Sequence, residues 1–268
     1  MRSAILNGRD FNELGAIELV AEGPCAIAIS RGGAAKTYSH TEPNEDACLF
    51  AFGPGGALIA VADGHHGAMG AEIAMRHLLE QAAPDWTGVK AGSAEALAGK
   101  AREALSAINL AILSEAERCK LAPSPTTLCI ALVRPDEDLL LHASVGDSHI
   151  FWTRDAAPVD LAWAAQSDEQ PAYLGYPPTP EREAKRRIAC ETLAGTRSLV
   201  LVTDGFSEAG IGHPVPETEL HAIQTRSLLG SNDLRPIETC RGVAESTLSI
   251  QRKHRAGDNL GCAVWIPS

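Results

Sequence analysis

The chain has 268 residues, of which 45% are hydrophobic and 21% charged, so it is long enough for one large core and we expect a single domain, 1–268. Its net charge of −11 at pH 7 argues against a nucleic-acid-binding surface, which normally needs a basic stripe. Seven cysteines lie scattered without a CxxC pair, which disfavours a disulfide framework and a structural zinc site. The sequence has no signal-peptide pattern and no apolar run of membrane-spanning length, so we expect a cytoplasmic protein with no membrane partner.

The chain begins with a segment of weak pattern. Residues 1–23 show little periodicity, and we expect either a short helix or an arm packed on the body. Residues 25–30 form an apolar run typical of a strand, and 31–43 is a polar loop rich in Gly, Ser and Thr.

Two apolar runs, 47–52 and 57–62, flank the turn sequence Gly53-Pro54-Gly55-Gly56, which predicts a β-hairpin. In a hairpin, the residues before the first strand and after the second lie at the same end of the sheet. We therefore expect Glu45, Asp46 and Asp63 to lie close together.

Two amphipathic helices follow the hairpin. Segments 68–82 and 93–120 each carry an apolar face, with Ser93 a suitable N-cap for the second, which indicates packing on a sheet. Three more strands are expected at 127–133, 139–145 and 149–153.

The pattern weakens from 154 to 197, where prolines and charges favour a flap or an irregular insertion with a short helix near 181–187. A strand at 198–203, a helix at 237–252 and a strand at 260–266 complete the chain. Strands and helices thus occur in blocks with little strict alternation, which predicts an α+β fold with largely antiparallel sheets.

Four aspartates mark the ends of predicted strands, and each lies beside a glycine: Asp63, Asp147, Asp204 and Asp258. If these carboxylates converge, they repel one another unless a cation lies between them. Oxygen ligands suit Mg²⁺ or Mn²⁺, and the lack of Cys or His at ligand spacing argues against zinc. The sequence therefore predicts an all-oxygen metal site.

Six motifs follow one another in the order found in a known family: Asn44-Glu45-Asp46-Ala47, Val61-Ala62-Asp63-Gly64-His65-His66-Gly67, Thr126-Thr127, Val145-Gly146-Asp147-Ser148, Thr203-Asp204-Gly205 and Gly257-Asp258-Asn259. With this ordered set the chain resembles the metal-dependent protein phosphatase (PPM) family, the type 2C serine/threonine phosphatases, from about residue 27 to its end. The resemblance implies a four-layer α/β/β/α sandwich with two central antiparallel sheets and flanking helices.

The resemblance also implies a binuclear Mg²⁺ or Mn²⁺ site at one end of the sandwich. Asp63 would bridge both ions, Asp204 and Asp258 would complete one site, and the Gly64 carbonyl with Glu45 would serve the other. Asp46 would act through coordinated waters, and Asp147 matches the aspartate that holds a third, weaker metal in many bacterial members. His65 matches the histidine proposed as the general acid.

The expected chemistry is hydrolysis of a phosphomonoester without a nucleophilic side chain. Two divalent ions about 3.5–4 Å apart lower the pKa of a bridging water and offset charge on the phosphoryl oxygens. A protonated His65 would supply a proton to the leaving alcohol, and we expect nearby carboxylates to keep its pKa high enough for that role.

Two positions depart from the family pattern. The arginine that commonly binds phosphate stands four residues before the glutamate matched by Glu45, where this chain has Thr41. Arg31, Lys36 or His40 could reach the phosphate, and Lys36 and Arg31 are our candidates for phosphate binding. The other departure is His149, which replaces the arginine of a GDSR motif and either alters the edge of the site or faces solvent.

The sequence thus predicts a cytoplasmic serine/threonine phosphoprotein phosphatase that uses metal-activated water. We expect a phosphorylated protein as its partner, no nucleic acid, and a monomer. Two alternatives stay open: a catalytically weak or inactive member that binds phosphoproteins as a regulatory module, and a phosphatase of small phosphorylated metabolites.

Overall fold

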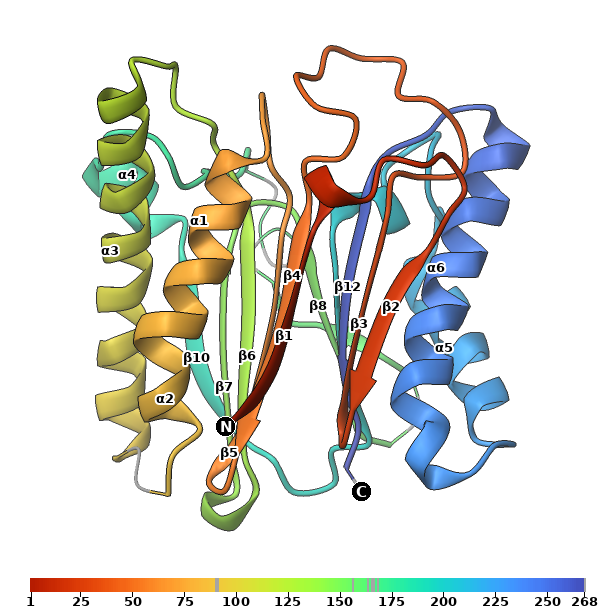
Figure 1. Cartoon of the computed structure of the whole chain (residues 1–268). Coiled ribbons are helices and arrows are strands. Elements are labelled where there is room, and N and C mark those ends of the chain that lie inside the picture. The colour runs from red at the N-terminus through yellow and green to blue at the C-terminus, as the bar shows by residue number, and fades with distance from the viewer. Residues whose placement is uncertain (90–91, 156, 163, 165–166, 168, 268) are drawn as a thin grey trace.

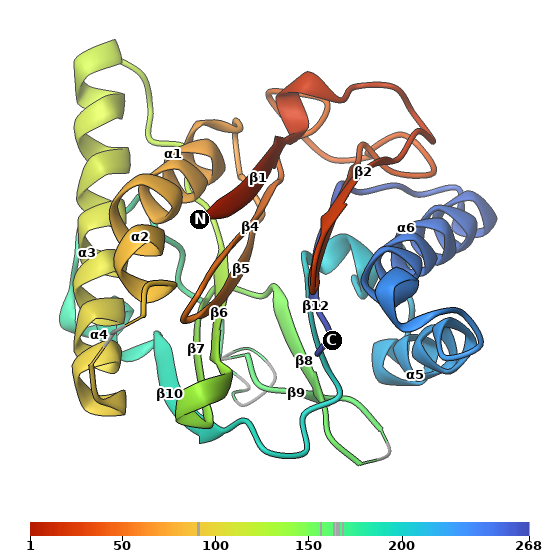
Figure 2. The ribbon, with the colours of Figure 1, turned by 60° about the horizontal axis from the view of Figure 1, so that its bottom comes forward.

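Two antiparallel sheets stack face to face, and helices cover the outer face of each (Figure 1 and Figure 2). The computed structural model describes residues 1–267 except 90–91, 156, 163, 165–166 and 168. This is the α+β four-layer sandwich that the sequence predicts, and the prediction is confirmed.

Six described strands make up the first sheet, in the order β1-β4-β5-β6-β7-β10. They are β1 (Arg2–Asn7), β4 (Ala47–Gly53), β5 (Gly56–Ala62), β6 (Leu128–Arg134), β7 (Leu139–Val145) and β10 (Arg187–Thr192). The second sheet has the order β2-β3-β12-β11-β8-β9. Its described strands are β2 (Glu18–Glu22), β3 (Cys25–Ser30), β12 (Leu260–Trp265), β11 (Ser198–Val202), β8 (His149–Thr153) and β9 (Val159–Asp160).

The helices form the two outer layers. Over the first sheet lie α1 (Met69–His77), α2 (Ala83–Trp86) and α3 (Ala94–Cys119), and over the second lie α5 (Pro216–Ser227) and α6 (Arg235–His254). The short α4 (Pro180–Ala184) precedes β10. Within the described residues, no helix combines the length and the apolar character needed to cross a bilayer.

Successive side chains of a strand point to opposite faces of its sheet, so the central strands supply apolar side chains to two layers of the core. In β5, Leu58, Ala60 and Ala62 pack against the helices, whereas Ile59 and Val61 pack against the second sheet. Such a strand is buried on both sides, which explains its continuous apolar sequence. The pattern also fixes the register, because a shift by one residue would exchange the two faces.

The predicted hairpin between β4 and β5 is present. Ala47 pairs with Ala62 and Gly53 with Gly56, so Asp46 and Asp63 leave the sheet at the same end. The predicted second helix is α3, whose N-cap Ser93 accepts a hydrogen bond from the Ala96 amide at 3.2 Å.

Residues 1–23 lie against the body of the protein, as the packed-arm alternative expected, but as two strands that the sequence did not predict. They contribute β1, which pairs with β4, and β2, which pairs with β3, and the helical part is a single 3₁₀ turn, Gly8–Asp10. Both are edge strands, which are partly exposed and so lack a regular apolar alternation.

The segment 154–197 is also more ordered than expected. It contributes the edge strands β9 and β10, and β10 pairs with β7 over its whole length. Five positions of this segment, 156, 163, 165–166 and 168, lie outside the described residues. The helix α5 was not expected from the sequence.

Candidate active site

An acidic pocket of about 430 Å³ opens where the strands of both sheets end, on the side of the loop 31–46. Its lining includes most of the predicted site residues: Lys36, Glu45, Asp63, Gly64, His65, Asp147, Asp204 and Asp258. Asp46 lies directly beneath, bonded to Thr203, whose neighbour Asp204 lines the pocket. We use the term acidic pocket for this cavity.

The backbone around Asp63 is held from both sides. Its amide donates to Thr127 Oγ1 at 2.8 Å, and its carbonyl oxygen accepts from Thr126 Oγ1 at 2.8 Å. A Cβ on Gly64 would lie 2.4 Å from the Glu45 carbonyl oxygen, so the close approach of the two hairpin ends requires glycine. These contacts hold the backbone of Asp63 in place directly after the end of β5.

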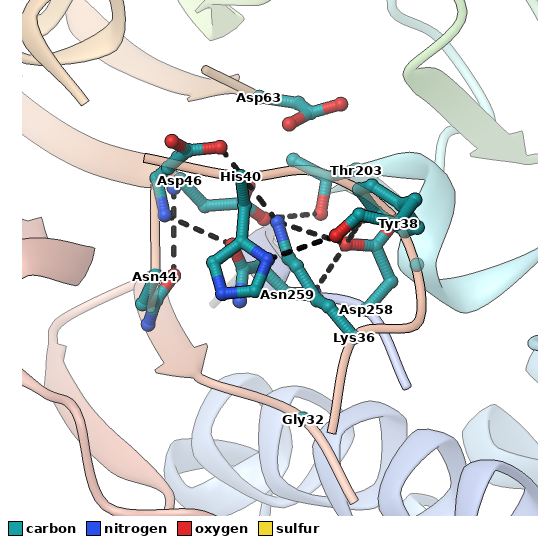
Figure 3. Close-up of polar contacts among 12 residues, drawn as sticks. Gly32, Lys36, Tyr38, His40, Asn44, Asp46, Asp63, Thr203, Asp258 and Asn259 are labelled. Atoms are coloured by element: carbon teal, nitrogen blue, oxygen red, sulfur yellow. Dashed lines mark hydrogen bonds and ion pairs between the residues drawn. The ribbon is translucent and has the colours of Figure 1, made fainter. Parts of the chain in front are cut away.

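Asn259 joins the segments that carry the other acids. Its Oδ1 accepts from the Glu45 amide at 2.9 Å, and its Nδ2 donates to the carbonyl oxygens of Arg31 at 3.1 Å and Pro43 at 2.9 Å. Figure 3 shows Asn259 beside Asp258 under this loop. The loop that carries Glu45 is thus bound to the strand that carries Asp258.

The carboxylates of the acidic pocket lie close together, so their negative charges repel one another when no cation is bound. Burial, together with neighbouring carboxylates, raises the pKa of Asp63 and of Asp204 well above the ordinary aspartate range. Burial also raises the pKa of Asp46 to about 7, despite the nearby Lys36, and that of Glu208 to about 7, with Asp258 adding to the shift. These groups would take up protons near neutral pH unless positive charge is supplied.

The residues present fit hard divalent cations. One oxygen each from Asp204, Glu208 and Asp258 lie within 4.8 Å of one another, and ligand atoms of Asp63, His65 and Asp147 form a second such group. Buried oxygens of three acids have no hydrogen-bond partner among the described residues: Asp46 Oδ1, Asp147 Oδ1 and Glu208 Oε2. Unsatisfied carboxylate oxygens at this density are the donor set that Mg²⁺ and Mn²⁺ prefer.

Lys36 is the cation that the described residues place among these acids. Its side chain is only 4% exposed, and its Nζ lies 3.2 Å from Asp258 Oδ1 and 3.9 Å from Glu45 Oε2. Burial by itself lowers the pKa of Lys36, but Asp258 and further carboxylates outweigh it and raise the pKa above the ordinary value. Figure 3 shows the ammonium aimed into the acidic group.

The other two candidate cations for phosphate binding lie elsewhere. Arg31 is absent from the described lining of the acidic pocket, and its Nη1 donates to the Asn12 carbonyl oxygen at 3.0 Å. His40 is exposed, and its Nδ1 lies 3.0 Å from the Tyr38 carbonyl oxygen. Of the two phosphate-binding candidates, the structure therefore brings only Lys36 to the site.

His65 lies at the rim of the pocket with its Nδ1 3.6 Å from Asp63 Oδ2. Its ring packs edge-on against Tyr173, with 4.7 Å between the ring centres. Burial lowers the pKa of His65, and the opposing effect of Asp147 is smaller. The expectation that carboxylates keep this pKa high is therefore wrong for the described residues, because loss of hydration outweighs their attraction.

Sequence reasoning missed several side chains of the pocket lining, and three of them, Tyr38, Tyr173 and Glu208, lie against its acids. Tyr38 donates a short hydrogen bond to Asp258 Oδ1, and Tyr173 OH donates to Asp147 Oδ2 at 2.8 Å. Glu208 follows Asp204 by four residues, on the turn in which its amide bonds to the Asp204 carbonyl oxygen at 2.7 Å. That spacing was a usable signal for Glu208, whereas both tyrosines lie in segments without periodicity.

His149 joins two elements of the second sheet. Its Nδ1 lies 2.6 Å from Asp160 Oδ2 on β9, and its Nε2 lies 2.5 Å from Ser207 Oγ. The sequence left open whether His149 alters the edge of the site or faces solvent. Its contact with Ser207, three residues after Asp204, favours the edge of the site.

Known proteins resemble this chain in sequence pattern and in fold. A family model described as protein phosphatase 2C matches residues 34–251. Serine-threonine phosphatase 2C from Toxoplasma gondii has 14% sequence identity and a TM-score of 0.67, over 94% of this chain and 99% of that one. PppA, a key regulatory component of T6SS in Pseudomonas aeruginosa, has 18% identity and a TM-score of 0.64, over 93% and 100%.

A third solved structure is the catalytic domain of the serine/threonine protein phosphatase PstP in complex with two manganese ions. It has 18% identity and a TM-score of 0.62, over 94% of this chain and 99% of that one. No curated protein sequence matched the chain. With sequence identities of 14% and 18%, the similarity to these three solved structures is evidence for a shared fold and for nothing further.

Proposed function

Because this chain belongs to the protein phosphatase 2C family of phosphomonoester hydrolases, we propose that it removes phosphoryl groups from phosphoserine or phosphothreonine in proteins. The observation that carries the proposal is the acidic pocket, where carboxylates from both sheets surround a buried lysine. Such a pocket attracts cations and, once these are bound, an anionic phosphoryl group.

The metal ligands in this proposal are carboxylates at the strand ends. Asp63 would serve both ions, Asp204 and Asp258 one of them, and Glu45 with the Gly64 carbonyl the other, while Asp46 acts through water. Asp147 would serve a third ion. When bound, Mg²⁺ or Mn²⁺ offsets the charge of the phosphoryl oxygens and lowers the pKa of a water molecule.

Lys36 binds the phosphoryl group in place of the family's arginine. Its ammonium has three N–H donors, and the contacts to Asp258 and Glu45 use at most two of them. A phosphoryl group in the pocket presents further oxygens to the same ammonium. A lysine ammonium lacks the planar, bidentate fork of arginine. It therefore fixes the orientation of the phosphoryl group less strictly than an arginine would.

His65 would supply a proton to the leaving alcohol, and because burial lowers its pKa only the protonated fraction of the enzyme is competent for this step. Its imidazole lies at the rim of the pocket, next to Asp63, and its side chain is 31% exposed. A seryl or threonyl oxygen leaves readily only if it is protonated, so a positioned imidazole lowers the barrier. Tyr173 holds the ring edge-on and restricts its rotation.

The expected partner is a phosphorylated protein, and we propose that the chain acts as a monomer in the cytoplasm. The described relatives support a protein substrate, since both the Toxoplasma and PstP proteins are serine/threonine phosphatases. Comparison of phosphopeptides with free phosphorylated metabolites separates this function from the alternative of a metabolite phosphatase.

The first test is hydrolysis of an aryl phosphate with Mn²⁺, with Mg²⁺ and with chelator, beside the Asp204→Asn variant. We expect turnover only with metal, and a loss of about a hundredfold or more in Asp204→Asn, because even outer-shell changes at metal sites reach that size. Manganese binding, measured by calorimetry, should weaken in parallel.

A folded protein that binds manganese but shows no turnover with any phosphoester would contradict this proposal. It would favour the alternative of a regulatory module that binds phosphoproteins. Circular dichroism of Asp204→Asn provides the control for folding.

A further inference from the structure

A second cavity lies at the opposite end of the sandwich from the acidic pocket. It has a volume of about 290 Å³, is open to solvent, and is lined by the end of the second sheet, α5 and α6. We call it the far-end pocket, and its lining includes Arg197, Ser198, His221, Gln224, Leu228 and Arg235.

Three adjacent strands separate the two cavities. β8 begins next to Asp147 and ends at Thr153, and β11 begins at Ser198 and ends before Asp204. In the same way β12 begins after Asp258 and leads to Ile266, so each strand has one end at each cavity. The far-end pocket is therefore distinct from the site of hydrolysis.

The charge of the far-end pocket is opposite to that of the chain. Arg197, His221 and Arg235 contribute two guanidinium groups and an imidazole, and none of its described lining residues is acidic. The whole chain carries a net charge of −11, so a cluster of this kind is not what the composition predicts. Cations gathered in a concave site attract an anion.

Among the described residues, one nitrogen of each guanidinium group has no acceptor or only a neutral one. Arg235 Nε is buried and has no hydrogen-bond partner within the described part of the chain. Arg197 Nη1 donates to the Asp155 carbonyl oxygen at 3.3 Å, which is a neutral acceptor at the edge of the accepted distance. A buried donor without an acceptor is costly, and a bound oxyanion would remove that cost.

The floor of the pocket is polar and its wall is apolar. Gln224 Nε2 donates to Ser198 Oγ at 2.8 Å, which leaves the Ser198 hydroxyl hydrogen available to a ligand. Leu228, 53% exposed, and Ile266 line the same cavity and offer apolar surface. A ligand that fits both parts has an anionic head and an apolar body.

We propose that the far-end pocket binds a small molecule that carries a phosphoryl group on an apolar or aromatic body. Two guanidinium forks, an imidazole and a serine hydroxyl provide more donors than the two oxygens of a carboxylate can use, whereas three phosphoryl oxygens match them. The cavity volume of about 290 Å³ is the size of a small-molecule site.

The test uses phenylphosphonate as probe, because its phosphorus–carbon bond resists phosphatase activity. Binding to the full chain is measured by calorimetry in the presence of chelator, so that metal at the acidic pocket does not hold the probe. We expect saturable binding that weakens about tenfold or more in Arg235→Gln and in Arg197→Gln, since each removes charge-assisted hydrogen bonds.

Two variants are the controls. Arg226→Gln removes an exposed arginine of α5, the helix that carries His221 and Gln224 of the pocket. Arg226 pairs with Glu219 and is absent from the described lining. Lys36→Gln removes the cation of the acidic pocket. Both should bind the probe as the wild type does, and unchanged melting temperatures should show that all four variants are folded.

Two results would overturn the proposal. One is the absence of saturable binding to the folded wild type. The other is binding that survives Arg197→Gln and Arg235→Gln but is lost in Lys36→Gln, because the probe would then occupy the acidic pocket.

Discussion

At the scale of single residues, the site depends on one cation whose place the sequence left open. Lys36 lies nine residues before Glu45, outside the register of the family's arginine, yet its ammonium is buried between Asp258 and Glu45. The loop between them makes this possible, because Glu45 Oε1 accepts from the Thr41 amide at 3.0 Å and the Glu42 amide at 3.1 Å. Thr41 thus contributes its backbone amide to hold the Glu45 carboxylate.

Replacement of Lys36 tests whether it binds the phosphoryl group. We expect Lys36→Gln to raise the KM for a phosphoserine peptide about tenfold or more at saturating Mn²⁺, because a charge-assisted contact is lost. Lys36→Arg should restore part of the affinity, since it keeps the charge. An unchanged KM in Lys36→Gln, with manganese affinity also unchanged, would exclude this role.

Replacement of His65 tests proton transfer to the leaving group. We expect His65→Gln to slow hydrolysis of a phosphoserine peptide by about 10²–10⁴, the usual contribution of a positioned acid. Hydrolysis of 4-nitrophenyl phosphate should change far less, because its leaving group needs no proton. Equal losses on both substrates would indicate that His65 acts by another route, such as support of Asp63.

At the scale of elements, the position of a strand within its sheet decided whether its sequence pattern was visible. The central strands β3, β5, β6 and β12 are buried on both faces and appear as apolar runs. The described edge strands are β1, β2, β9 and β10, and each was missed. In β1, β2 and β10 neither face is fully buried, so their side chains form neither an apolar run nor a strict alternation.

Close packing of the turn after β11 can be tested with two glycines. A Cβ on Gly205 would lie 1.9 Å from the Asn259 carbonyl oxygen, so Gly205→Ala must move Asp204 or the strand of Asp258. We expect a loss of about 1–3 kcal/mol in unfolding free energy, measured by urea denaturation, together with loss of activity.

Gly99 in α3 is the matched control, because a Cβ there meets nothing within 4 Å. Gly99→Ala should raise the unfolding free energy by about 0.5–1 kcal/mol through helix propensity, with unchanged activity. If the two alanines had the same effect, the packing argument for Gly205 would fail.

At the scale of the whole molecule, the site exists only because two sheets are stacked. Asp63 follows β5 of the first sheet, Asp204 and Asp258 adjoin strands of the second, and Asp147 lies on the connection from β7 of the first to β8 of the second. Thr203 Oγ1 donates to Asp46 Oδ2 at 2.7 Å and so connects the two sheets directly beneath the pocket. Any change in sheet packing therefore moves the acids relative to one another.

The interior between the sheets also makes stability depend on pH. His142 on β7 is fully buried, and burial, with a smaller contribution from Arg187, lowers its pKa from 6.5 to about 4, although Asp160 opposes the shift. Neither ring nitrogen has a hydrogen-bond partner among the described residues. The unfolded chain therefore binds a proton at this residue between pH 6.5 and 4 that the folded chain does not.

We expect this single residue to remove about 3 kcal/mol of stability as the pH falls from 6.5 to 4, with no further change below. The measurement is the unfolding free energy of the wild type minus that of His142→Leu across this range, in chelator. Leucine should be neutral or stabilising near pH 7, because an apolar side chain leaves no unsatisfied group. A difference that stays constant with pH would contradict the argument.

The sequence by itself determined the fold class, the hairpin that joins Asp46 to Asp63, and the strand-end acids, because buried strands and glycine turns leave local patterns. Only the tertiary structure decided the edge strands, the burial of Lys36, the lowered pKa of His65, and the approach of Tyr38, Tyr173 and Glu208 to the acids. These depend on which segments meet across the two sheets and on how much water they exclude. Distances between residues far apart in the chain, and the hydration of their side chains, have no local pattern in the sequence.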